Sequence, residues 1–193
     1  MARTMDELRA SVRRSFPELS QIRDPDLREK VVEAWALALS QTEYESIEQI
    51  PGSAVPGAPA MTGGTQTEHL RGVAQIALAM VDTLESLCGP LGVDRDVLIA
   101  GALCHDVGKP YEYSPRNRAR WEADPKKAGL PAIRHPVYGA HIALTVGLPE
   151  AVAHAAGGHS AEGERIERSL ENTIIHMADV AFWGILRKAG AIA

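Results

Sequence analysis

Hydrophobic residues between Thr67 and Leu87 recur at spacings of three and four, which places them on one face of an α-helix. They are Leu70, Val73, Ala77, Met80, Leu84 and Leu87. The same periodicity predicts a helix that ends near Ser40. Its start is marked by Asp24 as N-cap and Pro25 as first helical residue.

The stretch from Val97 to Asp106 is apolar on nearly all sides, so a helix there is predicted to be central and buried. Further helices are predicted over residues 135–146, 149–157 and 165–188. The segments 51–66 and 107–134 are rich in proline or glycine and are predicted to be irregular. No segment has the pattern of a strand, so the expected fold class is all-α.

The proline- and glycine-rich segment divides the chain into two predicted parts. Residues 1–60 form an N-terminal helical extension and linker, and residues 61–193 form the main helical domain. A hydrophobic content of 45% and a charged content of 23% are ordinary for a soluble globular protein. Neither a membrane-spanning run nor a targeting peptide is recognisable, so a cytoplasmic location without a membrane partner is expected.

The net charge and the cysteine positions argue against a nucleic-acid-binding protein, a zinc finger and a disulfide-stabilised protein. The net charge of -5 gives no basic footprint for a nucleic acid polymer, so none is expected as a partner. Cys88 and Cys104 lack the spacing of a zinc finger or a disulfide framework.

His105 and Asp106 stand at the end of the predicted buried helix, where polar side chains are costly unless something binds them. An imidazole and a carboxylate are ligands for divalent metals, and the negative end of the helix dipole favours a cation. A helix-terminal hydrogen bond would also explain the pair.

Two more polar residues lie on apolar helix faces. His69 is in line with Val73 and Met80, which fits a metal ligand or a core histidine bonded to a carbonyl. Asp179 shares the face of Ile175 and Phe182, and a buried aspartate needs an arginine or a metal as partner.

Together with His135-Pro-Val-Tyr-Gly-Ala and His159, these residues resemble the HD-domain superfamily of metal-dependent phosphohydrolases. The resemblance covers residues 67–188 and includes the Gly-Lys that follows Asp106-Val. It implies an HD-domain helical bundle preceded by the N-terminal helical extension.

The resemblance implies that a principal metal is held by His69, His105, Asp106 and Asp179. Members with two metals add two histidines, for which His135 and His159 are the best matches, and Asp106 then bridges the ions. Many such members read His-His where this chain has Gly158-His159, so one or two ions remain open.

Basic residues near these positions are candidates for binding an anionic substrate. Lys109 could neutralise a phosphate oxygen or be an exposed lysine, and Arg71 beside His69 is a second candidate. Segment 107–134 carries a net charge of +4. It could form a lid through Arg116, Arg118 and Arg120, or be a solvated loop.

The donor set suits one or two divalent ions of Mn, Fe, Co, Mg or Ni, which would activate water for attack on phosphorus. The expected function is a hydrolase that cleaves a phosphate ester of a nucleotide or small metabolite, with Asp106 and Lys109 as catalytic candidates. A di-iron oxygenase of the same superfamily and a metal-bearing ligand-binding module are the alternatives. The expected partner is a small anionic substrate, and a homodimer is compatible with the apolar stripes.

Overall fold

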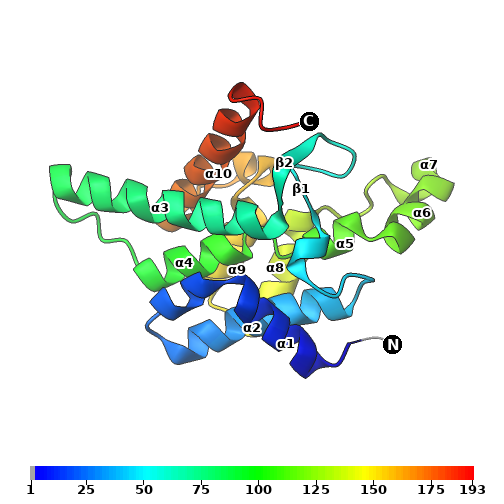
Figure 1. Cartoon of the computed structure of the whole chain (residues 1–193), viewed down its shortest axis with the longest axis horizontal. Helices are drawn as coiled ribbons and strands as arrows, with labels where there is room; N and C mark the ends of the chain where they lie inside the picture. The colour runs from blue at the N-terminus through cyan, green and yellow to red at the C-terminus, as the bar shows by residue number, and fades with distance from the viewer. Residues whose placement is uncertain (1–2) are drawn as a thin grey trace.

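The computed structural model describes residues 3–193 and is built mainly of helices (Figure 1). The α-helices are α1 (Met5–Ser15), α2 (Pro25–Ser40), α3 (Gln66–Cys88), α4 (Arg95–Cys104), α5 (Lys109–Tyr113), α6 (Pro115–Ala123), α7 (Pro125–Ala128), α8 (His135–Thr145), α9 (Glu150–Gly158) and α10 (Leu170–Lys188). Short 3-10 helices cover Pro17–Gln21, Ile47–Gln49 and Ala161–Arg165. The predicted all-α class is confirmed.

Helix starts follow the local capping chemistry. The Asp24 carboxylate accepts from the backbone N–H groups of residues 26 and 27, as predicted for α2. Asp94 caps α4 in the same way. In α3, Thr65 and Glu68 form a capping box, which fixes the first turn of the helix next to His69.

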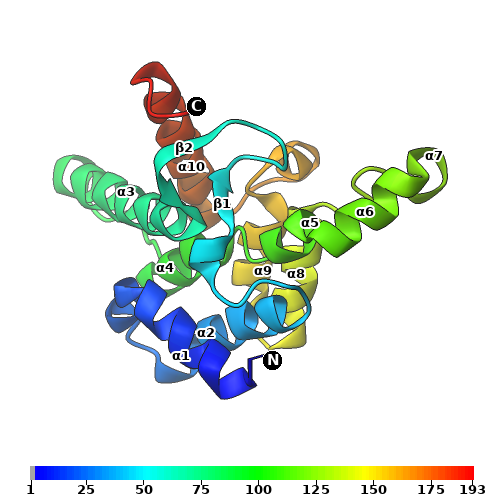
Figure 2. The same ribbon diagram turned by 45° about the vertical axis from the view of Figure 1, so that its right-hand side comes forward.

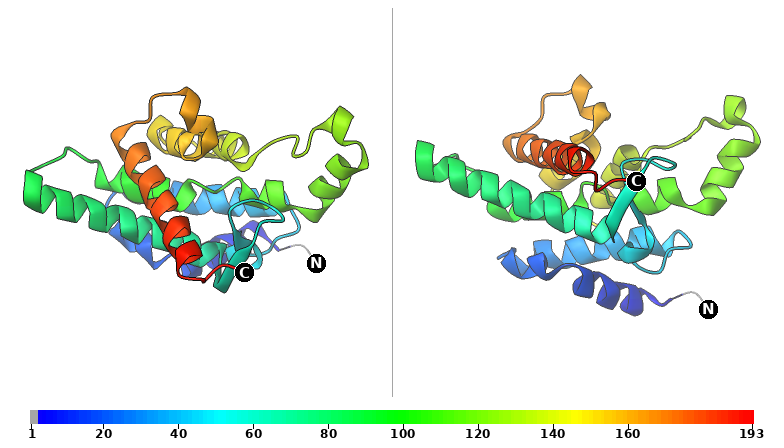
Figure 3. Two further views of the ribbon diagram at one scale, coloured as in Figure 1. Left: turned by 90° about the horizontal axis from the view of Figure 1, so that it is seen from above. Right: turned by 45° about the horizontal axis from the view of Figure 1, so that its top comes forward.

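Helix α4 lies in the middle of the molecule, with α1 and α2 on one side and α10 on the other (Figures 1 and 3). Its residues from Leu98 to Cys104 are all buried, as predicted. One hydrophobic cluster joins α1 and α2 to α3, α4, α9 and α10. The Trp35 indole N–H of α2 donates to the Leu103 carbonyl of α4 over 2.8 Å. Residues on both sides of the predicted boundary at residue 60 therefore share a core.

A short β-hairpin was missed by the sequence analysis. Strands β1 (Pro51–Ser53) and β2 (Ala60–Thr65) pair antiparallel, with Pro51 opposite Thr65. Met61 also forms a bridge with Ile192 near the C-terminus. The prediction of an irregular segment was wrong here, because contacts with a distant part of the chain stabilise a strand of low β-propensity.

Residues 107–134 were also predicted to be irregular, but α5, α6 and α7 lie within them. Pro110, Pro115 and Pro125 each occupy the first or second position of one of these helices. Proline is favourable there because the first turn of a helix needs no N–H donor. Helices α6 and α7, called the arm below, project from the body of the molecule (Figure 2). No helix in the described chain combines the length and hydrophobicity needed to cross a membrane.

Candidate metal centre

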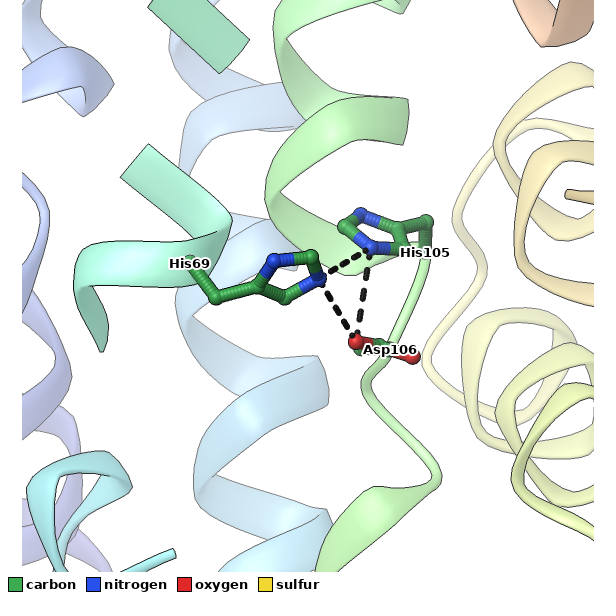
Figure 4. A group of neighbouring side chains, drawn as sticks. All are labelled: His69, His105 and Asp106. Atoms are coloured by element: carbon green, nitrogen blue, oxygen red, sulfur yellow. Dashed lines mark hydrogen bonds and ion pairs between the residues drawn. The ribbon is translucent and has the colours of Figure 1, made fainter. Parts of the chain in front are cut away.

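Three of the predicted ligands meet between α3 and the turn that follows α4 (Figure 4). The Nε2 atom of His69 lies 3.1 Å from Nε2 of His105 and 3.1 Å from Oδ2 of Asp106. His105 Nε2 is 3.4 Å from the same carboxylate oxygen. All three side chains are buried, so polar atoms converge in a place that excludes water.

The turn that carries Asp106 packs directly on the start of α8. A Cβ atom at Gly108 would collide with the carbonyl oxygen of His135 and approach the backbone nitrogen of Gly139. Glycine at this position therefore allows the two backbones to touch. This close approach brings His135 to the other side of the Asp106 carboxylate.

The second carboxylate oxygen of Asp106 faces two more predicted ligands. Its Oδ1 atom lies 3.2 Å from Nε2 of His135 and 3.5 Å from Nε2 of His159. The sixth predicted ligand, Asp179, lies near His69, with its Oδ1 atom 3.4 Å from Nε2 of His69. All six residues named from the sequence are thus brought together by α3, α8, α10 and the ends of α4 and α9.

The Nδ1 atoms of three histidines are held by acceptors outside the cluster. His105 Nδ1 is 2.7 Å from the Ala102 carbonyl oxygen, and His159 Nδ1 is 3.0 Å from that of Ala156. His135 is held by the Glu112 carboxylate, which also accepts from its backbone N–H. Because these acceptors place the proton on Nδ1, each Nε2 lone pair is free to bind a metal.

The donor arrangement fits a divalent cation. Two nitrogen ligands at ~2.1 Å and a right angle around one ion are about 3.0 Å apart, close to the spacing of the His69 and His105 nitrogens. Asp179 Oδ1 is buried without a hydrogen-bond partner among the described residues, so a cation would satisfy it. Three ligand triads meet the distances needed for an ion: His69, His105 and Asp106; His105, His159 and Asp179; Asp106, His135 and His159.

The protonation states also suit metal binding. Burial lowers the pKa of His69 to about 4, so its imidazole is neutral near pH 7. Burial raises the pKa of Asp106, but the positive charge of the adjacent Lys109 opposes this, and the pKa is held well below its usual value. A neutral imidazole and an ionised carboxylate are the forms that bind metals.

Lys109 is fully enclosed, which excludes the alternative of an exposed lysine. Its ammonium nitrogen lies 2.8 Å from Asp106 Oδ2, 2.8 Å from the Ser53 carbonyl and 3.1 Å from Gln66 Oε1. Gln66 also donates to Asp106 Oδ2 over 2.8 Å. The three N–H groups of Lys109 thus have partners, and with Gln66 they hold Asp106 in place.

The other basic candidates lie on acidic or carbonyl partners outside the cluster. Arg71 Nε is 2.9 Å from the buried carboxylate of Glu18. On α6, Arg118 pairs with Glu122, and Arg116 donates to the Gln41 carbonyl and pairs with Glu43. Arg120 donates over 3.4 Å to the Tyr111 hydroxyl and to Asn117 Oδ1. Their roles in substrate binding stay predictions.

A cavity of about 190 Å³ opens beside the cluster. It is lined by Ala54, Val55, Asp106, Lys109, Arg134, His135, His159, Ser160, Asp179 and Trp183. The predicted arginines are not among these residues. Sequence analysis counted Arg134 only within the positive charge of segment 107–134 and missed Ser160. Both are immediate neighbours of the two histidines that face Asp106 Oδ1.

Comparison with known proteins agrees with this site. The family model of the HD domain matches residues 67–181 of the sequence. The chain therefore belongs to the HD-domain family, as its motifs predicted. The chain is 41% identical over 99 residues to the dihydroneopterin 2',3'-cyclic phosphate phosphodiesterase of Methanocaldococcus jannaschii. That alignment covers 48% of this chain and 38% of the relative, so this chain matches well under half of the relative's length. No solved structure gives a significant match.

Proposed function

We propose that this protein is a divalent-metal-dependent phosphohydrolase that cleaves a phosphodiester in a small, nucleotide-like molecule. The observation that carries the proposal is the placement of Asp106 between two groups of imidazoles. Its Oδ2 faces His69 and His105, and its Oδ1 faces His135 and His159. A carboxylate shared in this way suits a pair of ions, and we propose two.

Divalent ions bound here would lower the pKa of a bound water and neutralise charge on the phosphoryl oxygens. The chain's own contribution is positioning. Lys109 and Gln66 both donate to Oδ2 of Asp106 and so fix its carboxylate. The fixed Nδ1 partners of His105 and His159 keep their Nε2 atoms directed at the site.

The proposed substrate class rests on the relative and on the size of the cavity. The name of the relative describes the hydrolysis of a cyclic phosphodiester. The cavity of about 190 Å³ is smaller than the ~300–1,000 Å³ of pockets that enclose whole ligands. We therefore propose that the phosphodiester and the atoms next to it enter, while the rest of the substrate remains outside.

The test uses the whole protein, purified without added metal. Elemental analysis gives the native metal and its stoichiometry. Turnover is then measured with Mn, Fe, Co, Mg and Ni on cyclic phosphodiesters, linear phosphodiesters and phosphomonoesters. Cytidine 2',3'-cyclic phosphate is one member of this panel. We expect about two bound ions per chain and the fastest cleavage with a phosphodiester.

Two variants give the test a matched comparison. Asp106→Ala removes the shared ligand and is expected to lose bound metal and turnover while keeping its helical content. His141→Ala changes an exposed histidine outside the cluster and is expected to resemble the wild type. Turnover retained in Asp106→Ala, or consumption of oxygen with substrate in place of phosphodiester hydrolysis, would refute the proposal.

A further inference from the structure

Two cationic side chains line the cavity, Lys109 and Arg134, and they differ in how far their donors are used. The ammonium group of Lys109 has a partner for each of its three N–H bonds. It is therefore engaged with the protein and has no donor left for a substrate.

Most N–H groups of the Arg134 guanidinium make no hydrogen bond to the described residues. Within residues 3–193, its guanidinium makes one hydrogen bond, a long one of 3.4 Å from Nη2 to the Ser160 hydroxyl. Its Nε lies 3.1 Å from Oε1 of Glu162, but this N–H is buried and not aligned with an acceptor. The other oxygen of Glu162 is also buried without a partner. Arg134 is thus held near an acid, yet most of its N–H groups remain available.

Its position in the fold places Arg134 in the wall of the cavity beside the ligand cluster. Arg134 is the N-cap residue of α8 and directly precedes His135. Ser160 directly follows His159 at the end of α9. Both residues line the cavity, so an anion bound at these histidines would share the cavity with the guanidinium and the hydroxyl.

We propose that Arg134 and Ser160 bind a non-bridging oxygen of the substrate and that Glu162 matches them to a singly charged phosphodiester. This inference rests on the proposed phosphodiesterase function. Because Glu162 offsets the charge of Arg134, the pair stabilises one negative charge better than two. A phosphomonoester, which carries a second negative charge near neutral pH, is disfavoured next to the Glu162 carboxylate.

The test measures KM and kcat with cytidine 2',3'-cyclic phosphate and inhibition by cytidine 3'-phosphate. Arg134→Ala is expected to raise KM by about tenfold or more, since a charge-assisted hydrogen bond is lost, with kcat changed by less than about threefold. Arg134→Lys is expected to recover only part of the loss, because lysine lacks the planar fork. Glu162→Gln is expected to strengthen inhibition by the monoester by about tenfold.

Arg13→Ala is the matched control, since Arg13 forms a surface ion pair with Glu29 on helices that contribute no residue to the cavity. Metal content is measured for every variant and is expected to equal that of the wild type. An active wild type with an unchanged KM in Arg134→Ala would overturn this inference and leave the proposed function standing. Loss of metal in Arg134→Ala, or unchanged monoester inhibition in Glu162→Gln, would also overturn it. A wild type that cleaves no phosphodiester overturns both proposals.

Discussion

The ligand cluster and the arm formed by α6 and α7 both carry many ionisable groups, but they use them in opposite ways. In the cluster, histidines and carboxylates from distant segments are buried with their lone pairs facing one another. In the arm, charges are exposed and find nearby partners, as Arg118 does with Glu122. Of these two regions, only the cluster contains a buried polar atom without a hydrogen-bond partner, which a bound cation would satisfy.

This difference shows why the density of charge is a poor guide to an anion site. The segment 107–134 has a net charge of +4, yet of its basic residues only Lys109 and Arg134 line the cavity. Partial burial reduces screening by water, so one cation at the cavity contributes more than several solvated ones. The comparison can be tested by substituting charged residues around the cluster and in the arm.

Glu112 offers the strongest test, because it lies in α5, just before the arm, and holds His135 of the cluster in place. It accepts from both the backbone N–H and the Nδ1–H of His135. We expect Glu112→Gln to reduce the metal content from about two ions to about one and to lower kcat by about 10- to 100-fold. Elemental analysis and steady-state kinetics measure the two effects.

Glu122→Gln is the control for this variant, since Glu122 is an acidic residue of α6 whose partner is Arg118. It should keep both ions and full activity. If Glu112→Gln also retained both ions at wild-type affinity, Glu112 would have only a structural role and the two regions would be independent.

The contrast also explains what could be predicted from the sequence. His69 and Asp179 stood out because polar residues on an apolar helix face are rare and need a partner. The capping residue Asp24 gave a correct helix start because capping acts within a few residues. Most of the helices were predicted from local signals of this kind, whereas His135 and His159 were named from the family resemblance.

Other features depend on contacts between distant segments, so no local pattern reveals them. Strand β2 is paired with the C-terminal residues, which a window of the sequence cannot show. Glu112 and Arg134 resemble ordinary charged residues until α5 and α8 are brought together. Arg71 was predicted to contact an anionic substrate, which stays a prediction, and its ion pair with Glu18 could not be read from the sequence.

Arg71→Ala therefore tests whether an arginine near the cluster acts on the substrate or on the fold. The Glu18 carboxylate is buried and would keep only its hydrogen bond from Gln75. We expect the free energy of unfolding to fall by about 2 kcal/mol, since a buried charge loses its main partner, while KM stays unchanged. Chemical denaturation and kinetics measure the two quantities. A raised KM at unchanged stability would instead assign Arg71 to substrate binding.

The smallest effect is expected from the combined replacement of Arg116, Arg118 and Arg120 by alanine. These residues do not line the cavity, so they can act on an anionic substrate only at long range. We expect KM to rise by less than about threefold at low ionic strength and the change to vanish near 0.15 M salt, where the Debye length is about 8 Å. The corresponding lysine variant keeps the charge and should match the wild type. An increase in KM that persists in salt would show direct contact and restore the predicted lid.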